Sequence, residues 1–197
     1  MTAFEKTKDG YLFATAAHCV GEDQTEGKER SAKWQNTAFF MTFDEPQNKT
    51  FYPAEVRGVG FQHRGDDFAI FEVKTDQKWT TIGLGDEKKE EDGNPVINVA
   101  SPLGLGKQVY RGVISSLDLD RPLIQGDINW RHSISLQIAA DGGSSGSAII
   151  SAEQDKIIAF LVGTVGGAVV IAIPVSKFIT FRNAVDAGTY KYFDKEP

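Results

Sequence analysis

Short runs of apolar and aromatic residues, separated by turn-forming residues, recur along the chain. Its 197 residues include 20 glycines, and a Gly-rich chain with many short apolar runs favours antiparallel β-structure. We therefore expect an all-β protein. The predicted strands cover residues 11–16, 37–43, 51–56, 68–73, 96–100, 108–116, 134–138, 148–151, 157–162 and 168–173.

A hydrophilic stretch from Gly83 to Asn94 separates two series of strands, and we interpret it as the connection between two β-units. After Pro174, apolar residues recur at close to a helical period over residues 175–187, which predicts a short closing helix. The predicted organisation is an N-terminal unit over residues 1–83, a second unit over residues 84–178, and a C-terminal helix and tail over residues 179–197.

Composition and charge argue against several functional classes. Hydrophobic residues make up 41% of the chain and charged residues 24%, which is ordinary for a globular protein. The net charge of −6 gives no sequence-wide footprint for nucleic acid or an anionic membrane. The longest apolar segment, residues 157–175, is interrupted by three glycines and is interpreted as two strands. We expect no nucleic acid, no membrane span, no metal and no other cofactor.

The lone cysteine, Cys19, excludes a disulfide within the chain, so core packing must hold the fold together. Met1 is followed by neither a basic nor an apolar region, and no signal peptide is visible. The sequence leaves the localisation open: cytoplasmic, or periplasmic or extracellular if upstream residues are missing.

The segment Gly143-Ser144-Ser145-Gly146-Ser147 is a candidate nucleophile loop. Acyl transfer to serine requires a hydroxyl, a base, an acid that orients the base, and N–H donors for the oxyanion. Glycines on both sides permit a sharp turn that would direct the amides of Gly143 and Ser145 at one spot. On its own, such a pentapeptide is more often a flexible turn, and the residues leave the choice among Ser144, Ser145 and Ser147 open.

His18 is the candidate base. It ends an apolar run and has small neighbours, Ala16 and Ala17, which leave room for an imidazole and a substrate. His63 and His132 lie in polar surroundings, and we interpret both as surface residues.

The candidate orienting acid is Asp67, or its neighbour Asp66. Both precede the apolar run that begins at Phe68, where a carboxylate could be partly desolvated and still reach a histidine. The simpler interpretation is that both residues begin a strand.

Three motifs resemble those of trypsin-like serine proteases of the chymotrypsin fold. Thr15-Ala16-Ala17-His18-Cys19 resembles the family's histidine motif, and Asp67-Phe68-Ala69-Ile70 resembles its aspartate motif, which selects Asp67. The segment 143–147 resembles Gly-x-Ser-Gly-Gly with serine in the last place, which selects Ser145. The chain order His, Asp, Ser is that of chymotrypsin. The resemblance implies a serine endopeptidase with His18, Asp67 and Ser145 as catalytic triad and Gly143 and Ser145 as oxyanion-hole donors.

Further segments resemble the HtrA/Deg branch of this family: Leu84–Asp86, Ala100–Gly106, Arg111–Ser115 and Ala172–Pro174. The resemblance covers nearly the whole chain and implies two antiparallel six-stranded β-barrels, with the active site in the cleft between them. It aligns the first four residues with the second strand of the first barrel, so the opening strand is missing. We therefore expect Phe4 on an edge strand that a partner subunit, a loop or an upstream segment covers. The expected partners are polypeptide substrates and a second copy or another partner at this edge.

The resemblance also locates a specificity pocket. Its floor falls at Ala139 and Ala140, and one wall at Leu161, Val162, Gly163 and Thr164. These residues supply no carboxylate or cation, so we expect a preference for small or medium aliphatic side chains before the scissile bond. The alternative function is a catalytically silent protein of the same fold that binds peptides or protein partners.

Overall fold

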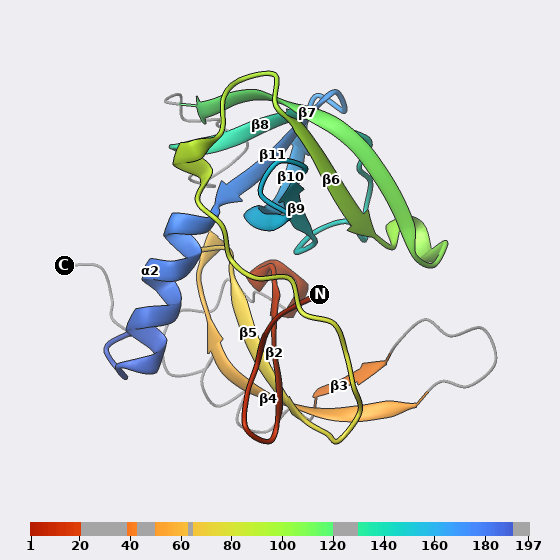
Figure 1. Cartoon of the computed structure of the whole chain (residues 1–197), viewed down its shortest axis with the longest axis vertical. Helices are drawn as coiled ribbons and strands as arrows, with labels where there is room; N and C mark the ends of the chain where they lie inside the picture. Colours follow the sequence, from red (N-terminus) through yellow and green to blue (C-terminus); the bar gives the residue numbers. More distant parts are fainter. Residues whose placement is uncertain (21–38, 43–49, 63–64, 120–129, 191–197) are drawn as a thin grey trace.

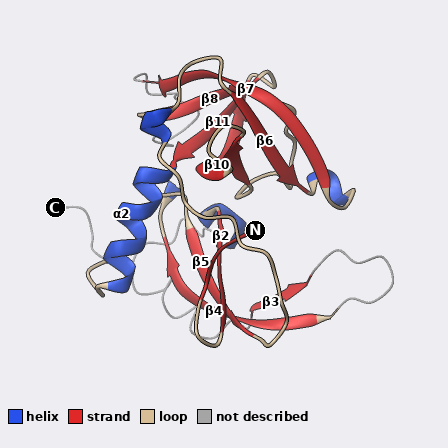
Figure 2. Ribbon diagram, viewed as in Figure 1, coloured by secondary structure: helices blue, strands red, loops and turns tan. Residues whose placement is uncertain are grey.

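The structure, a computed structural model, describes residues 1–20, 39–42, 50–62, 65–119 and 130–190, with two β-units stacked one above the other and a helix along one side (Figure 1). The protein is mostly β, as predicted (Figure 2). Each of the predicted runs contains a strand. The first unit contains β1 (Thr2–Lys6), β2 (Gly10–Thr15), β3 (Phe39–Thr42), β4 (Phe51–Val59) and β5 (Ala69–Lys74). The second contains β6 (Pro95–Ala100), β7 (Gln108–Leu119), β8 (Ser133–Gln137), β9 (Ala148–Ser151), β10 (Lys156–Val165) and β11 (Val169–Pro174), followed by α2 (Val175–Asp186). Short 3-10 turns are η1 (Ala17–Val20), η3 (Glu87–Lys89) and η4 (Pro102–Gly104).

The second unit is a closed barrel of six strands in the order β10-β11-β8-β7-β6-β9. Its inward-facing side chains form a continuous aliphatic core that includes Ile114, Leu136, Ile149 and Ile158. Closure removes unpaired strand edges. This barrel agrees with the six strands that the family resemblance implies.

The first unit agrees with the prediction that the opening strand of a six-stranded barrel is missing, although its described strands form a sheet and not a closed barrel. Its described strands form a five-stranded sheet in the order β1-β2-β5-β4-β3, which leaves β1 and β3 at the two edges. Phe4 therefore lies on an edge strand, as predicted. Along that edge, the carbonyl oxygen of Ala3 accepts a hydrogen bond from the backbone N–H of Ile82 at 3.0 Å.

The connection between the units is tied to both of them. Besides the Ile82 bond to β1, Gly85 N–H donates to the carbonyl of Ile157 at 2.8 Å, and Ile157 N–H donates to the carbonyl of Gly83 at 2.9 Å. Figure 1 shows this segment passing beside the N-terminus, between the two units. The loop, which was predicted from its polarity alone, therefore pairs with β10 at one position, Leu84 with Ile157.

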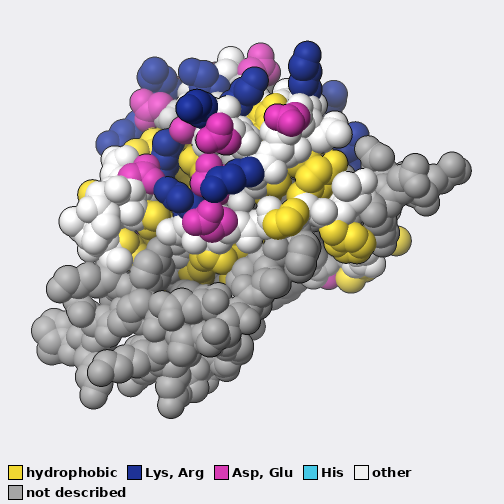
Figure 3. Space-filling view, turned by 90° about the horizontal axis from the view of Figure 1, so that it is seen from below, with side chains coloured by type: hydrophobic (Ala, Val, Ile, Leu, Met, Phe, Trp, Pro, Cys, Tyr) yellow, Lys and Arg dark blue, Asp and Glu magenta, His cyan; other side chains and the backbone are white. Residues whose placement is uncertain are grey.

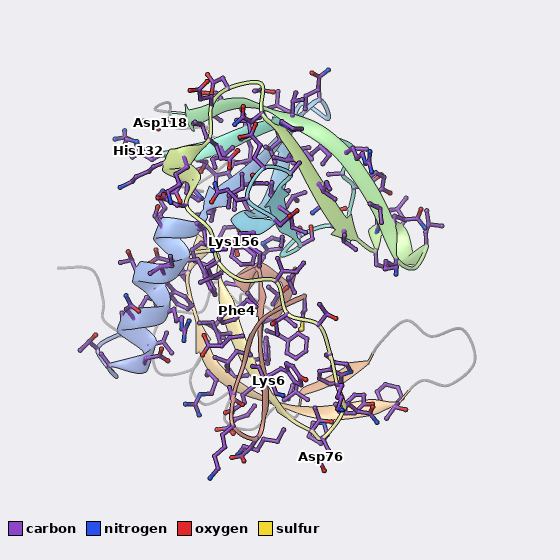
Figure 4. The ribbon with its side chains drawn as sticks, viewed as in Figure 1. Phe4, Lys6, Asp76, Asp118, His132 and Lys156 are labelled. Carbon is purple, nitrogen blue, oxygen red and sulfur yellow. The ribbon has the colours of Figure 1, made fainter. Side chains whose placement is uncertain are left out.

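An aromatic cluster joins the two units and α2. Phe178 of α2 is fully buried, and its ring centroid lies 5.1 Å from Phe4, 5.3 Å from Phe68 and 4.7 Å from Phe160. Phe4 and Phe68 come from the first unit and Phe160 from the second; Figure 4 labels Phe4 among these side chains. Such edge-to-face and tilted contacts add to the gain from burying apolar area. The cluster fixes the relative position of the two units.

The surface carries charges of both signs. Figure 3 shows Lys and Arg intermixed with Asp and Glu on the face seen from below. Among the described residues, no helix combines the length and apolar character needed to cross a membrane.

We expect Phe178→Ala to lower the free energy of unfolding by about 3–5 kcal/mol, because it leaves a cavity where three aromatic side chains meet. Phe51, whose side chain is 62% exposed on β4, gives the matched control: Phe51→Ala should change stability by about 0.5 kcal/mol or less. Urea unfolding followed by tryptophan fluorescence measures both. Equal losses in the two variants would contradict the role assigned to the cluster.

Candidate active site

His18 and Asp67 meet because two paired strands end at the same place. β2 and β5 are antiparallel and bring Thr15 opposite Ala69. His18 follows the end of β2 by three residues, and Asp67 precedes β5 by two. Antiparallel pairing therefore places both residues at one end of the first unit.

Asp67 makes two contacts with His18. Its Oδ2 lies 2.7 Å from His18 Nδ1, and its Oδ1 accepts a hydrogen bond from the His18 backbone N–H at 3.0 Å. The carboxylate is fully buried, whereas the His18 side chain remains 28% exposed. The second contact fixes the residue that carries the ring, so the imidazole is held from one side and open on another.

A neighbouring glycine permits this arrangement. A Cβ at Gly60 would overlap the carbonyl oxygen of Asp66, so only glycine allows the segment before Asp67 to pass so close to β4. The sequence gives no signal for this role, because the close approach involves two segments that only the fold brings together.

The candidate nucleophile loop consists of two consecutive turns. Ser144 N–H donates to the carbonyl of Asp141 at 2.9 Å, and Ser147 N–H donates to that of Ser144 at 3.1 Å. Glycine is third in each turn, with φ of +97° at Gly143 and +75° at Gly146. Turns with a positive φ at the third residue favour glycine there, which explains the spacing of the two glycines.

Two carbonyls of this loop are bound on its inner side. The Gly142 carbonyl accepts from Leu103 N–H at 2.7 Å, and the Ser144 carbonyl accepts from the Ser147 hydroxyl at 2.6 Å. The described chain has no cis peptide bond, and in a trans peptide the C=O and the N–H point in opposite directions. The N–H groups of Gly143 and Ser145 therefore point away from these partners. Neither has an acceptor within the described part of the chain.

The nucleophile loop packs directly against the loop that carries His18. A Cβ at Gly146 would overlap Thr15 Oγ1 and the backbone nitrogen of Ala16. Cys19 Sγ lies 3.7 Å from the carbonyl oxygen of Ser145, to which its S–H donates.

Among the described residues, the Ser145 hydroxyl has no hydrogen bond to the His18 ring. In proteins without bound substrate, catalytic hydrogen bonds are often long and shorten only in the complex.

The three serines of the loop differ in exposure. Ser144 and Ser147 are buried, with 0% and 4% of their surface exposed, whereas Ser145 is half-buried. Ser145 is therefore the one of the three that a substrate could approach.

The other candidates for base and acid lie elsewhere. Asp66 Oδ2 accepts a hydrogen bond from the Tyr190 hydroxyl at 3.3 Å. His132 Nδ1 lies 3.0 Å from Asp118 Oδ1, and both side chains are more than 60% exposed at the outer end of β7 and β8 (Figure 4). This agrees with the interpretation of His132 as a surface residue. His63 lies outside the described residues.

The environment of His18 favours its charged form. Burial of the ring lowers its pKa, but the hydrogen bond and charge of Asp67, with a contribution from the Cys19 side chain, outweigh burial and raise the pKa to about 10. The described residues contain no group of three or more His, Cys, Asp or Glu side chains that could hold a metal ion.

The predicted pocket wall adjoins the nucleophile loop. Leu161 N–H donates to the Ser147 carbonyl at 2.9 Å, and the Leu161 carbonyl accepts from Gly146 N–H at 2.7 Å. The pairing of β10 with β9 ends at Phe160. Beyond Leu161, the side of β10 nearest the nucleophile loop therefore has no paired strand in the described structure. The four predicted wall residues differ in exposure: Leu161 and Val162 are buried, while Gly163 and Thr164 are half-buried.

The two predicted floor residues precede the nucleophile loop. Ala139 is exposed and Ala140 half-buried. Trp130, which no sequence pattern singles out, lies beside this wall. A Cβ at Gly163 would lie 3.0 Å from its indole ring, so the ring supports this part of the wall. The contact joins positions 130 and 163, which are far apart in the sequence, so no local pattern indicates it.

The family model for the trypsin-like peptidase domain matches residues 2–160. The chain belongs to this family. The family recognition made from the three motifs is thereby confirmed. Over 103 residues the chain is 25% identical to the periplasmic serine endoprotease DegP of Salmonella typhimurium, a match that covers 52% of this chain and 21% of DegP.

Solved structures share the fold, among them that of an HtrA-type protease. The HtrA-type protease AlgW with decapeptide has a TM-score of 0.71 at 16% identity, over 95% of this chain and 51% of the AlgW chain. Deg5 has a TM-score of 0.69 at 16% identity, over 95% of this chain and 84% of Deg5. The predicted chymotrypsin fold is therefore confirmed. The chain spans about a fifth of DegP and about half of the AlgW chain.

We expect NMR titration to give His18 a pKa of about 10. Asp67→Asn removes the negative charge beside the ring and should lower that pKa. The folded-state pKa exceeds the unfolded value of about 6.5. The stabilisation from the His18–Asp67 contact is therefore fully present below pH about 6.5, and this stabilisation is lost as pH rises through about 10. Asp67→Asn should therefore cost more stability at pH 6 than above pH 10. An unchanged His18 pKa in this variant would contradict the assignment.

Proposed function

We propose that this protein is a serine endopeptidase in which His18, Asp67 and Ser145 form the catalytic triad. The observation that carries the proposal is the fully buried Asp67 carboxylate on His18 Nδ1 at 2.7 Å, with the Ser145 loop packed against the His18 loop. A buried carboxylate on one ring nitrogen leaves the other nitrogen to accept a proton. Membership of the trypsin-like peptidase family supports the same conclusion.

Each residue then has a defined role. His18 Nε2 takes the proton from the Ser145 hydroxyl as Oγ attacks the scissile carbonyl, and Asp67 stabilises the imidazolium that forms. The same proton passes to the leaving amine. Water then attacks the acyl-enzyme, again with His18 as base, and releases the product acid. The free N–H groups of Gly143 and Ser145 hold the oxyanion.

The charge state of His18 sets the pH dependence. Only the neutral ring accepts a proton, and its pKa of about 10 keeps most of the resting protein protonated at neutral pH. Activity therefore rises as pH approaches this pKa. The Cys19 side chain contributes to the raised pKa of His18, so the fraction of protein with a neutral His18 ring depends on Cys19.

The pocket proposed for the side chain before the scissile bond has Ala139 and Ala140 as floor and the segment from Leu161 to Thr164 as one wall. The unpaired side of β10 beyond Leu161 is suited to receive the substrate backbone as an added strand. The named residues carry no ionisable side chain, so the pocket favours small or medium aliphatic side chains. AlgW, which shares the fold, has a solved structure with a decapeptide.

The proposed partners are polypeptide substrates, with a second copy or another protein along β1. The Ile82 bond covers this edge at Ala3, so such a partner would add to a contact made by the chain itself.

The triad predicts strongly non-additive losses. Ser145→Ala and His18→Ala should each lower kcat on a labelled casein by several orders of magnitude, and the double variant should lose little more, because the residues act as a unit. The matched control is His132→Ala on the surface. Near-normal turnover by Ser145→Ala would overturn the proposal. A protein that binds casein tightly but neither cleaves it nor reacts with a fluorophosphonate would instead be a silent binding protein.

Cleavage-site profiling tests the pocket. Mass spectrometry of denatured protein digests should show cleavage after Ala, Val, Ile or Leu, with modest discrimination among them, since one methylene is worth about 1–3 kcal/mol. Digestion by Ser145→Ala gives the background. Predominant cleavage after Lys, Arg or Glu would show that the pocket is wrongly assigned.

A further inference from the structure

A buried series of hydrogen bonds connects β6 to the nucleophile loop. Asn98 of β6 and Ser147 have 0% and 4% of their surface exposed. Asn98 Nδ2 donates to Ser147 Oγ at 2.7 Å and to the Ala148 carbonyl at 2.9 Å. The Ser147 hydroxyl in turn donates to the Ser144 carbonyl at 2.6 Å. An amide, a hydroxyl and a backbone carbonyl are thus connected in one direction.

The donors and acceptors at each step determine the direction of this series of hydrogen bonds. Turning the Asn98 amide over would place Oδ1 against the Ala148 carbonyl oxygen, so two acceptors would face each other without a proton. Nδ2 must therefore face Ser147 and Ala148. The Ser147 hydroxyl then receives a hydrogen bond and gives its own proton to Ser144. Asn98 Oδ1 has no partner within the described structure.

The last acceptor in this series, the Ser144 carbonyl, belongs to the same peptide group as the Ser145 N–H. That carbonyl is bound twice, by the Ser147 N–H and by the Ser147 hydroxyl. Because a trans peptide is planar, fixing its C=O also fixes the direction of its N–H. Hydrogen bonds to the carbonyl also polarise the peptide group, which strengthens its N–H as a donor.

The motif resemblance makes the serine informative. The family pattern Gly-x-Ser-Gly-Gly has glycine where this chain has Ser147. With glycine there, only a main-chain N–H would hold the Ser144 carbonyl, and Asn98 would lose its hydroxyl partner inside the barrel. Unsatisfied buried polar groups are costly, so Asn98 and Ser147 depend on each other.

We propose that Asn98 and Ser147 are positioning residues that hold the Ser145 N–H in the direction required for oxyanion binding. The inference rests on the proposed function, since it assigns these residues to the same site. They act through the Ser144 carbonyl and touch no substrate.

The test measures labelling of Ser145 by a fluorophosphonate, which needs the nucleophile and the oxyanion donors but no matched peptide side chain. Ser147→Ala should lower the maximal rate constant of labelling, kinact, about ten-fold, which is less than the loss expected from deleting an oxyanion donor outright. The reagent concentration that gives half of this rate, KI, should be unchanged. Ser147→Gly, which restores the family pattern and keeps the main-chain donor, should show the same change. Asn98→Ala should lower kinact in the wild-type background and have little further effect in Ser147→Gly, because Asn98 acts through the hydroxyl.

Ser151→Ala is the matched control. Ser151 is a fully buried serine on β9 whose hydroxyl accepts from the N–H groups of Glu153 and Gln154 at 3.1 and 3.0 Å. This variant should lower the melting temperature and leave kinact unchanged, which separates positioning from general stability. All rates are measured well below the melting temperature of each variant.

The outcomes distinguish the two proposals. If the wild-type protein labels with a fluorophosphonate and cleaves casein, but Ser147→Ala and Ser147→Gly keep the wild-type kinact, the positioning role is wrong and the protease assignment stands. A fall of equal size in Ser151→Ala would also overturn it. If the wild-type protein neither labels nor cleaves, the proposed function itself fails, and this inference fails with it.

Discussion

A carboxylate removed from water must have its charge compensated, and Asp67 is fully buried. Its two oxygens are both used by His18, one through the ring and one through the backbone N–H. The loops around it must therefore converge closely, and glycine at position 60 is what lets the segment before Asp67 approach β4. The orientation of the imidazole and the raised pKa of His18 both depend on this one pair.

The same short segment connects the site to the core. Phe68, next to Asp67 in the chain, is fully buried, and its ring packs against Phe160 of the barrel and Phe178 of α2. Burying these aromatic rings holds the two β-units in one relative position, because moving either unit would expose apolar area to water. The distance between the His18 loop and the Ser145 loop is therefore fixed by packing, in a chain that has no disulfide.

The nucleophile loop is organised by its carbonyls. Partners on the inner side, Leu103 N–H for Gly142 and the Ser147 hydroxyl for Ser144, determine which way the opposite N–H groups face. A short Gly/Ser segment would otherwise sample many conformations, because glycine has little backbone restriction. Hydrogen bonds from the turn η4 and from Ser147, which Asn98 of β6 binds in turn, give it one conformation at the junction of the two units.

The sequence by itself determined the fold class and the local chemistry. Apolar runs at strand length predicted the β-elements, the spacing of Gly143 and Gly146 matched two turns, and three motifs in chymotrypsin order indicated the family. These features depend on neighbours in the chain, so they can be read along it. Only the tertiary structure decided the full burial of Asp67, the order of the strands in the first sheet, and the contacts of Gly60, Trp130 and Asn98. Each of these depends on segments far apart in sequence, whose approach is set by packing and by the pairing of buried polar groups, and neither leaves a local pattern.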